Sequence, residues 1–551
     1  MSKQLQHKDL VVTEELDPSL PPLSSWMKQA EWWRVRAIHL SLENSTLRAE
    51  NEKQALLIAD LHGQVEALTA KLKDLAHRIF GRKTEKEPST DQDRPDNETA
   101  VSENSHCRGQ KRGAPGHGRH RHPELPTREV VLDLSEQEKH CQICGLPFPR
   151  FPGMEESEQI DWRVTLERVV TRRPRYRKTC SCPGLPAIIT APPHPKLIKK
   201  GMFTVDFIVK LLVLKYLLAM PMNRIKSYLR MEGLILASGT LAGVMESVIP
   251  FLEPLYSAIC ARNAASDRLK ADETGWKVFT DTTGKKTHRW WLWVFASPDT
   301  AAFILSPSRS SETPKNHLDI EQDPSLEKIL RIMLTDFYSA YRVLKDVLHA
   351  WCWAHMRRKF IDAARGYTQL KDWSEQWVSR IGMLYHLNGE RLAQAALSHE
   401  WAEAESRLRQ FVEEEIHAVW IRELADPDTH HASRDVLKSL ERQWDGLTLF
   451  LDFPEVALDN NESERLLRTP VVGRKNFYGS GARWSGDLAA MLWTIFATAQ
   501  MNEGNPILFL TALLDACAAN GGRSLDGPEL ERFFPWAWSE ADARAWGRNT
   551  S

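Results

Sequence analysis

The chain of 551 residues lacks the features that define secreted and membrane proteins. Its eight cysteines are too few and too scattered for a disulfide-stapled scaffold, so we expect a protein of the reducing cytoplasm. The N-terminal segment has no apolar run of the kind found in signal peptides. The longest apolar stretch, 203–220, is interrupted by Asp206, Lys210 and Lys215, which predicts a buried core helix and no membrane span.

An excess of charge of either sign is also lacking. Lys and Arg total 72 against 73 for Asp and Glu, a formal net charge of −1. This balance removes the simplest argument for a nucleic-acid partner, a strongly basic average, but leaves room for local basic segments. Hydrophobic residues make up 42% and charged residues 26%, which is ordinary for globular proteins, and the length predicts three or four folded units.

A heptad repeat occupies residues 36–83, after an N-terminal arm at 1–35. The d positions of the heptad are Leu40, Leu47, Gln54, Leu61, Leu68 and Leu75. The a positions are Asn44, Asn51, Ile58, Val65, Leu72 and Ile79. This pattern predicts a parallel two-stranded coiled coil whose two a-position asparagines fix register and a dimeric state. The alternative is one long amphipathic helix packed on its own domain.

Residues 84–127 are expected to form a disordered linker whose charge changes sign along its length. Its first part is acidic, whereas 108–122 contains no acid and alternates Gly and His with cations. These cations are Arg108, Lys111, Arg112, Arg119 and Arg121. A flexible basic segment suits contact with DNA phosphates, because each neutralised phosphate releases counterions. A solvated tail without a partner is the alternative.

A cysteine cluster in residues 128–200 has the spacing of a zinc site. Cys141 and Cys144 form a C-x-x-C pair, and Cys180 and Cys182 form a C-x-C pair after an arginine-rich segment, 162–178, that predicts two strands of a small ribbon. Four thiolates would bind a structural Zn²⁺, with His140 as a substitute for one of them. Buried free cysteines that only pack are the alternative.

Residues 201–262 show helical periodicity, and a helix capped by Ser or Thr is expected to open at Ser238. This arrangement is compatible with a helix-turn-helix, and equally with an ordinary helical packing layer.

Three acidic residues follow in settings that suit divalent metal. Asp272 and Asp336 each lie where an apolar strand is expected to end, and Glu464 lies in the first turns of a helix that Asp459 or Asn460 would cap. Carboxylate oxygens are the ligands that a pair of Mg²⁺ ions needs. Taken singly, each of these acids would be assigned to a surface loop.

Five segments in order give these acids a context: 271–274 (ADET), 334–338 (LTDFY), 352–360 (CWAHMRRKF), 459–465 and 473–476 (GRKN). Together they resemble the large transposase of bacterial insertion sequences of the IS sixty-six type (TnpC). The resemblance implies a mixed α/β fold with an RNase-H-like catalytic core, a leucine-zipper-like N-terminus, a zinc module and a short C-terminal domain. It also implies that Asp272, Asp336 and Glu464 are the DDE residues, with two Mg²⁺ (or Mn²⁺) ions per active site.

Two departures from the family pattern are visible. The second cysteine pair is C-x-C where C-x-x-C is more frequent, and Gly275-Trp276 follows the first acidic motif where proline is common. Cys352 and His355 match the family's C-x-x-H pair, for which we expect a structural role. The stretch between Asp336 and Glu464 is too long for a simple connection and predicts a helical insertion domain.

The predicted catalytic core therefore comprises 263–345 and 456–505, with the insertion at 346–455 and a C-terminal domain at 506–551. Beyond Glu464, cations interleave with aromatic residues and glycines, as expected of a surface for transposon-end DNA. The cations expected to contact DNA there are Arg465, Arg468, Arg474 and Lys475.

The sequence thus predicts a cytoplasmic, dimeric or higher-order transposase that cuts transposon ends and joins them to target DNA, with accessory proteins of the same element as further candidate partners. Two alternatives remain: a catalytically inactive DNA-binding regulator built on the zipper and zinc module, and an RNase-H-type nuclease acting on RNA–DNA hybrids.

Overall fold

The computed structural model describes residues 26–80, 143, 146, 166–177, 188–280, 288–318, 331–344 and 347–547. The chain divides into two compact units, one of residues 1–82 with 169–551 and one of residues 83–168. The predicted basic linker and the four predicted zinc cysteines lie outside the described residues.

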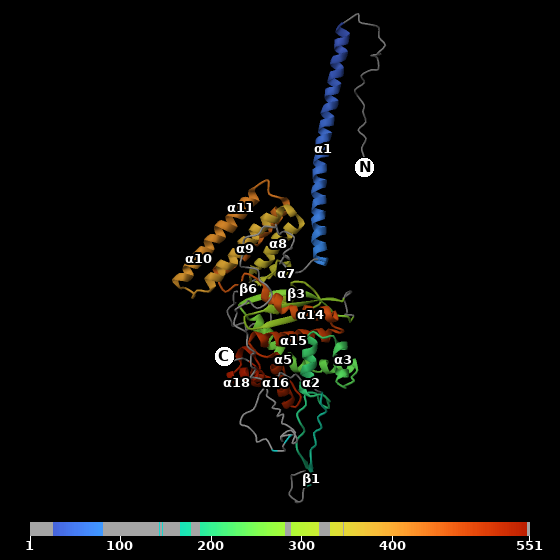
Figure 1. Cartoon of the computed structure of the whole chain (residues 1–551), viewed down its shortest axis with the longest axis vertical. Coiled ribbons are helices and arrows are strands. Elements are labelled where there is room, and N and C mark those ends of the chain that lie inside the picture. The colour runs from blue at the N-terminus through green and yellow to red at the C-terminus, as the bar shows by residue number, and fades with distance from the viewer. Residues whose placement is uncertain are drawn as a thin grey trace. The chain divides into compact units, whose positions relative to one another are not determined.

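A five-stranded mixed sheet organises the larger unit (Figure 1). Its strands are β3 (Arg268–Lys277), β4 (Arg289–Ala296), β5 (Ala301–Ser306), β6 (Arg331–Thr335) and β7 (Val347–Trp351). They lie in the order β5-β4-β3-β6-β7. The pairs β3–β4 and β4–β5 are antiparallel, whereas β6 runs parallel to both β3 and β7. Apolar runs rich in tryptophan and β-branched residues favour these strands.

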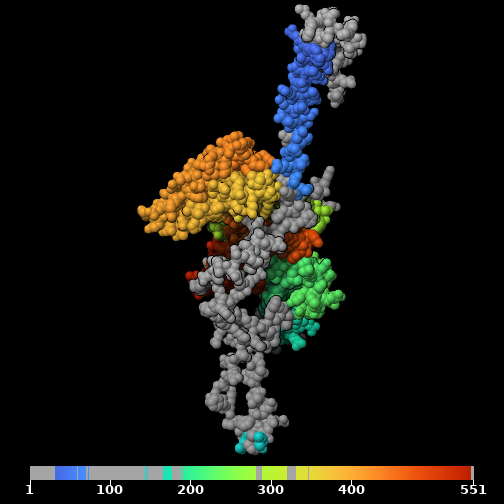
Figure 2. Space-filling view, turned by 45° about the horizontal axis from the view of Figure 1, so that its top comes forward, coloured from blue at the N-terminus to red at the C-terminus, as the bar shows by residue number. Residues whose placement is uncertain are grey.

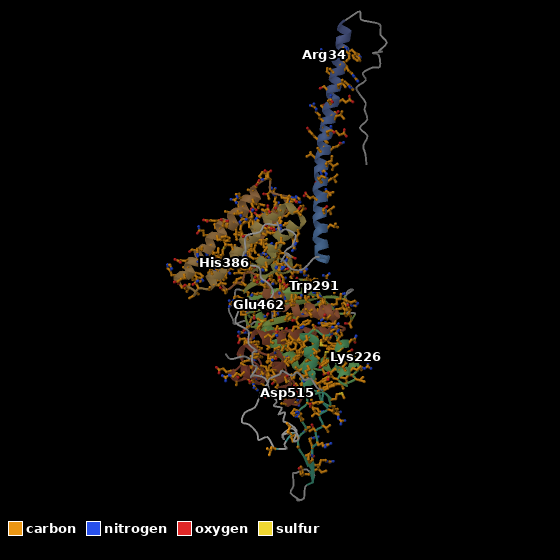
Figure 3. The ribbon with its side chains drawn as sticks, viewed as in Figure 1. Arg34, Lys226, Trp291, His386, Glu462 and Asp515 are labelled. Carbon is orange, nitrogen blue, oxygen red and sulfur yellow. The ribbon has the colours of Figure 1, made fainter. Side chains whose placement is uncertain are left out.

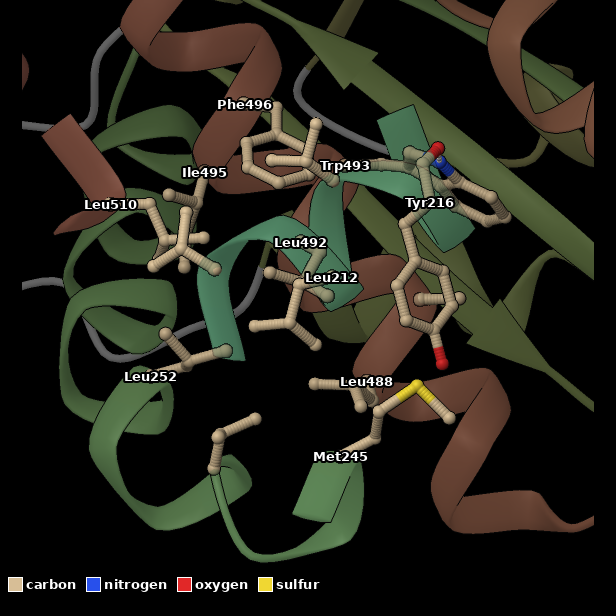
Figure 4. Close-up of a cluster of buried hydrophobic side chains, with 14 of the residues drawn as sticks. Leu212, Tyr216, Met245, Leu252, Leu488, Leu492, Trp493, Ile495, Phe496 and Leu510 are labelled. Atoms are coloured by element: carbon tan, nitrogen blue, oxygen red, sulfur yellow. Dashed lines mark hydrogen bonds between the residues drawn. The ribbon is translucent and has the colours of Figure 1, made fainter. Parts of the chain in front are cut away.

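One face of the antiparallel strands is covered by helices from two distant parts of the chain (Figure 4). The earlier helices are α2 (Val205–Leu212), the π-helix η1 (Val213–Leu217), α3 (Met222–Met231), α4 (Ser238–Glu246) and α5 (Ile249–Ala264). The later ones are α15 (Arg483–Met501) and α16 (Pro506–Ala519). Helix α15 is apolar nearly all round, which is typical of a helix buried on every side, and its Trp493 contacts both Tyr216 and Trp276.

Two side chains of helix α15 accept hydrogen bonds from the backbone of strand β5, which lies at the edge of the sheet. The Thr494 hydroxyl accepts a hydrogen bond from the Phe303 backbone N–H at 2.8 Å, and the Thr498 hydroxyl accepts one from Ala301 at 3.1 Å. Because these backbone groups are buried, the two hydroxyls protect an edge that would otherwise carry unpaired N–H groups.

A helical segment follows β7 and carries its own hydrophobic core. Its helices are α8 (Trp353–Gly366), the short η2 (Thr368–Leu370), α9 (Lys371–Leu392), α10 (His399–Phe411), the π-helix η3 (Val412–His417), α11 (Ala418–Ala425) and α12 (His431–Asp452). Figure 2 shows their surface in yellow and orange. The helical content that the sequence predicted for this stretch is confirmed.

Short helices complete the unit. They are α6 (Glu312–Leu318), α7 (Ser339–Arg342), α13 (Asn461–Leu466), α14 (Arg468–Phe477), α17 (Gly527–Glu531), η4 (Pro535–Ala537) and α18 (Glu540–Ala545). Helix α4 begins at Ser238 as expected, but the predicted hydroxyl cap is wrong, because Ala237 holds the capping position and no side chain caps the helix.

The segment with the heptads forms one continuous helix, α1 (Trp26–Phe80). Downstream, β1 (Arg175–Arg177) pairs antiparallel with β2 (Ile188–Thr190). A two-stranded ribbon is present, but only its first strand lies within 162–178, so the prediction of two strands in that segment is wrong: the second strand follows the C-x-C motif. Among the described residues no single helix has the length and hydropathy of a membrane span, although the bent pair α4–α5 reaches both when its helices are taken together.

Candidate active site

The two predicted aspartates lie side by side on neighbouring parallel strands. Strand β3 pairs with β6 in the register Leu269 to Met333 and Lys270 to Leu334. Continued by two residues, this register sets Asp272 beside Asp336, which directly follows β6. Neighbouring strands are about 4.8 Å apart, so the two carboxylates share one edge of the parallel strands. Asp272 lies inside β3 and not at its end, contrary to expectation, because β3 continues along its antiparallel partner β4.

The third acid is carried by helix α13, which contacts β3. Glu464 donates its backbone N–H to the carbonyl oxygen of Asn460 at 3.2 Å, which closes the first turn. Of the two expected capping residues, Asp459 accepts the backbone N–H of Asn461, the first residue of α13, at 3.1 Å. Asn460 holds the capping position without a side-chain cap, because its amide donates to the Ala271 carbonyl oxygen instead. In the same helix Glu462, labelled in Figure 3, forms an ion pair with Lys270 of β3, with 2.7 Å between Oε2 and Nζ. This pair connects α13 to β3.

The three acids lie near enough to influence one another electrostatically, although their carboxylate oxygens do not all lie within 4.8 Å of one another. Burial raises the pKa of Asp272 to about 8, and the negative charges of Glu273, Asp336 and Glu464 act in the same direction. A carboxyl group disfavours ionisation when it is removed from water and faces like charges. Such a concentration of acids fits a divalent cation, which would remove the repulsion.

A fourth acid, Glu273, lies next to Asp272 in the sequence, and the sequence analysis assigned it no role. Successive residues of a strand point to opposite faces, so Glu273 points away from Asp272 into a buried pocket. Its Oε1 accepts hydrogen bonds from Arg309 at 2.8 and 2.5 Å, and its Oε2 accepts one from the Tyr341 hydroxyl at 2.5 Å. Because both oxygens are engaged, Glu273 is a poor candidate for a metal ligand.

Arg309 links this pocket to the second aspartate. Its guanidinium lies 3.8 Å from the ring centroid of Tyr338, and its carbonyl oxygen accepts a hydrogen bond from the Tyr338 hydroxyl at 2.8 Å. The backbone N–H of Tyr338 in turn donates to the carboxylate of Asp336 at 2.9 Å. The sequence held no signal for Arg309, since it lies in a loop after β5.

The C-x-x-H pair lies at the same edge. Cys352 is fully buried and follows β7, whose register with β6 places it beside Asp336. His355, on α8, has its Nε2 3.7 Å from a carboxylate oxygen of Glu464. Burial lowers the pKa of His355, against the opposing influence of Glu464 and Asp336. The pair therefore borders the acids, a placement that the sequence did not predict.

The cations expected to contact DNA divide into two groups. Arg465, Arg468 and Lys475 are exposed on α13 and α14, close in sequence to Glu464. Arg474 instead donates to the Thr274 hydroxyl at 2.9 Å and to the Gly275 carbonyl oxygen, so it holds α14 to β3. The five cations of the basic linker lie in the part of the chain that the structure does not describe.

Another group of potential metal ligands exists elsewhere. Among the described residues, Glu66, His430 and His431 alone form a His, Cys, Asp or Glu triple whose ligand atoms all lie within 4.8 Å of one another. His430 Nδ1 already accepts a hydrogen bond from the Ala432 backbone N–H at 3.2 Å, and His431 Nε2 pairs with the Tyr367 hydroxyl at 3.1 Å. Because these nitrogens have partners, we assign the group no role.

Comparison with known proteins places the site within a matched region. A family model described as "Transposase IS66 family" matches residues 200–487, about half of the chain, and this range includes Asp272, Asp336 and Glu464. Three proteins of Sinorhizobium fredii, each described as uncharacterized, are similar over most of their length. Protein y4jD is 26% identical over 75% of this chain and 80% of its own, and y4qI is 26% identical over 74% and 75%. Protein y4hP is 24% identical over 76% and 78%.

Proposed function

The chain belongs to the transposase IS66 family, and we propose that it is a DNA transposase that cuts the ends of its mobile element and joins them to target DNA. The proposal is supported by the register of β3 with β6, which sets Asp272 beside Asp336, by the contact of α13 with β3, and by the influence of Asp336 and Glu464 on the pKa of Asp272. The strand order β5-β4-β3-β6-β7 supports an RNase-H-like core.

We propose that these three acids hold two Mg²⁺ or Mn²⁺ ions. Asp272, Asp336 and Glu464 would supply the carboxylate oxygens that hold the ions. When bound, such an ion pair activates the attacking oxygen and stabilises the leaving oxygen of a phosphodiester. Water is the attacking group in end cleavage, and the freed 3′ hydroxyl is the attacking group in strand transfer, so no covalent protein–DNA intermediate is required.

The exposed cations beside Glu464 are proposed to bind the DNA backbone at this site. Arg465, Arg468 and Lys475 lie on consecutive short helices, and phosphate contacts of this kind position a duplex without reading its sequence. Sequence recognition of the terminal inverted repeats is proposed for the cysteine module, which Zn²⁺ would stabilise through Cys141, Cys144, Cys180 and Cys182, and for the basic linker.

We propose that α1 pairs two copies of the chain, so that both ends of the element are cut in one complex. In the single chain the a and d side chains are open to solvent: Leu40, Leu47, Ile58, Leu61, Val65, Leu68 and Leu72 are each 43–68% exposed. An apolar seam of this length, interrupted by Asn44, Asn51 and Gln54, is stabilised when a second helix covers it. The proposed location is the bacterial cytoplasm, where the DNA substrate is found.

Cleavage of labelled duplexes carrying the ends of the encoding element tests the proposal. With Mg²⁺ the wild-type protein should nick these ends, and EDTA should stop the reaction. We expect Asp272→Asn to lower the rate by on the order of 10³-fold or more while leaving end binding intact. Asp267→Asn is the matched control, because Asp267 lies just before β3 with its side chain 57% exposed, and within the described part of the chain that side chain pairs with Arg268 alone.

The outcomes separate the alternatives. Specific binding of the ends without nicking by the wild-type protein would favour an inactive regulator. Hydrolysis of RNA–DNA hybrids without strand joining would favour an RNase-H-type nuclease. Full cleavage by Asp272→Asn would remove the assignment of the site.

A further inference from the structure

A chain of buried hydrogen bonds connects the three segments that carry the acids. Asn460 is fully buried, and its Nδ2 donates to the carbonyl oxygen of Ala271, the residue before Asp272, at 2.8 Å. Its own carbonyl oxygen accepts the backbone N–H of Glu464 at 3.2 Å. Asn460 therefore joins the strand of the first acid, through its side chain, to the helix turn of the third, through its backbone carbonyl.

Cys352 extends this chain to the second acid. Its backbone N–H donates to the carbonyl oxygen of Thr335, the residue before Asp336, at 3.1 Å. Its Sγ accepts the backbone N–H of Asn460 at 3.3 Å. Burial raises the pKa of the Cys352 thiol, so the sulfur is an uncharged acceptor. Asn460 and Cys352 together thus contact the residue preceding each aspartate and the turn that presents the glutamate.

The chemistry of position 460 is restricted. A carboxylate there would place a negative oxygen against the Ala271 carbonyl, and an apolar side chain would leave that buried carbonyl without this donor. Leaving a buried polar group unpaired costs about 1–3 kcal/mol. The amide is oriented by this contact, since its Oδ1 has no partner among the described residues.

We propose that Asn460 and Cys352 are positioning residues that hold Glu464 at the distance from Asp272 and Asp336 at which the acids can share metal ions. This inference rests on the proposed function of the three acids. Neither residue touches DNA or metal in this scheme. Both act through backbone groups adjacent to the acids, so their loss shifts the carboxylates without removing any of them.

The first test compares Asn460→Ala with Asn461→Ala. Asn461 is the next residue, is exposed and makes no side-chain hydrogen bond among those described, so it controls for changes at the start of α13. Misplacement of a reacting group by about 1 Å costs on the order of 10²-fold in rate. We expect single-turnover cleavage by Asn460→Ala to fall about 10- to 100-fold and the half-saturating Mg²⁺ concentration to rise, with end binding unchanged. Asn461→Ala should match the wild type.

The second test compares two substitutions of Cys352. If Cys352 served only to fill space, alanine would be tolerated better than serine, because serine buries a hydroxyl. If its sulfur is needed as an acceptor for Asn460, Cys352→Ser should retain more cleavage activity than Cys352→Ala. Its half-saturating Mg²⁺ concentration should also be lower than that of Cys352→Ala. This rank order stays informative if Asn460→Ala fails to fold.

The results distinguish this inference from the proposed function. Cleavage by the wild-type protein together with wild-type rates and Mg²⁺ dependence in Asn460→Ala would overturn the inference and leave the transposase assignment standing. If the wild-type protein does not cleave, the inference is tested by the binding of Mn²⁺ alone, measured by calorimetry. About tenfold weaker binding by Asn460→Ala than by the wild type would support a positioning role. Equal binding by the two proteins, or no binding by either, would overturn the inference. Alanine outperforming serine at Cys352 would also overturn it.

Discussion

Burial, together with the nearby negative charges of Glu273, Asp336 and Glu464, raises the pKa of Asp272 from an ordinary 3.8 to about 8. Between these values the folded protein holds a proton that the unfolded chain has lost. Protonation therefore favours folding, and the contribution of Asp272 to the free energy of unfolding falls as the pH rises from about 4 to about 8. A bound metal ion reverses this effect, because it requires the ionised carboxylate and releases the proton.

Asp272→Asn tests this sign. The neutral amide removes the repulsion between the acids. In EDTA at pH 8 the variant should therefore melt several degrees above the wild type, since 1 kcal/mol corresponds to about 2–4 °C for domains of 150–250 residues. The difference should shrink toward pH 4. Scanning calorimetry across this range measures it, and adding Mg²⁺ at pH 8 should stabilise only the wild type. A difference that does not vary with pH would contradict the pKa assignment.

The pairing of Arg309 with Glu273 gives a second prediction for single residues. The Glu273 side chain is 1% exposed, so Arg309→Met would leave a buried acid without its cation, at a cost of roughly 3–5 kcal/mol in the free energy of unfolding. Adding Glu273→Gln to Arg309→Met should recover part of this loss, because the amide carries no charge. Urea denaturation measures both effects.

Arg262→Met is the control for that experiment. Arg262 pairs with Asp299 at 2.9 Å, but the two side chains are 52% and 29% exposed, so its loss should cost no more than about 1 kcal/mol. If Arg309→Met and Arg262→Met lowered the free energy of unfolding equally, burial of Glu273 would not make its ion pair more important than an exposed one.

At the scale of elements, the contact between α12 and β7 depends on one small residue. Gly446 is buried on α12, and a Cβ there would overlap the indole of Trp351 and the carbonyl oxygen of His349. Strand β7 leads directly into Cys352, so this contact supports the edge that carries the acids. We expect Gly446→Ala to lower the free energy of unfolding by about 1–3 kcal/mol, measured by urea denaturation.

Gly389→Ala is the matched helical control. Gly389 is exposed on α9 with nothing within 4 Å of an added Cβ. Alanine there should raise the free energy of unfolding by about 0.5–1 kcal/mol, because glycine loses more backbone entropy in a helix. An unaffected Gly446→Ala would show that helix propensity offsets the contact with β7. A destabilised Gly389→Ala would show that the helix-propensity argument fails at that position.

The same elements show what the sequence could and could not predict. Periodicity located the strands and helices, because burial of one face imposes a period of about two or 3.6 residues. The settings of Asp336 after a strand and Glu464 in a first helical turn followed from the same local patterns. The position of Asp272 inside β3 did not, since it depends on pairing with β4. The bonds of Asn460 to Ala271 and Cys352 join residues far apart in sequence, and no local pattern encodes them.

At the scale of the whole molecule, the exposed seam of α1 determines the expected oligomeric state. Leu47 and Leu61 occupy d positions and are 52% and 49% exposed in the single chain. Covering such side chains contributes about 25 cal/mol for each Å² of apolar surface removed from water, so a second copy of the helix should bind along the seam. Charges at two d positions would have to be buried in that interface, which is strongly unfavourable.

The double variant Leu47→Asp with Leu61→Asp should therefore be monomeric at concentrations where the wild type is a dimer, as measured by light scattering after size exclusion. Leu56→Asp is the control, because Leu56 lies at the outward f position of the heptad, 73% exposed, and its charge would remain in water. If the dimer brings two ends together, the double variant should still bind one labelled end, but should lose coupled cleavage of two ends on one DNA. A monomeric wild type, or an unchanged mass in the double variant, would contradict the pairing, because the seam would then lack the partner that its exposed leucines require.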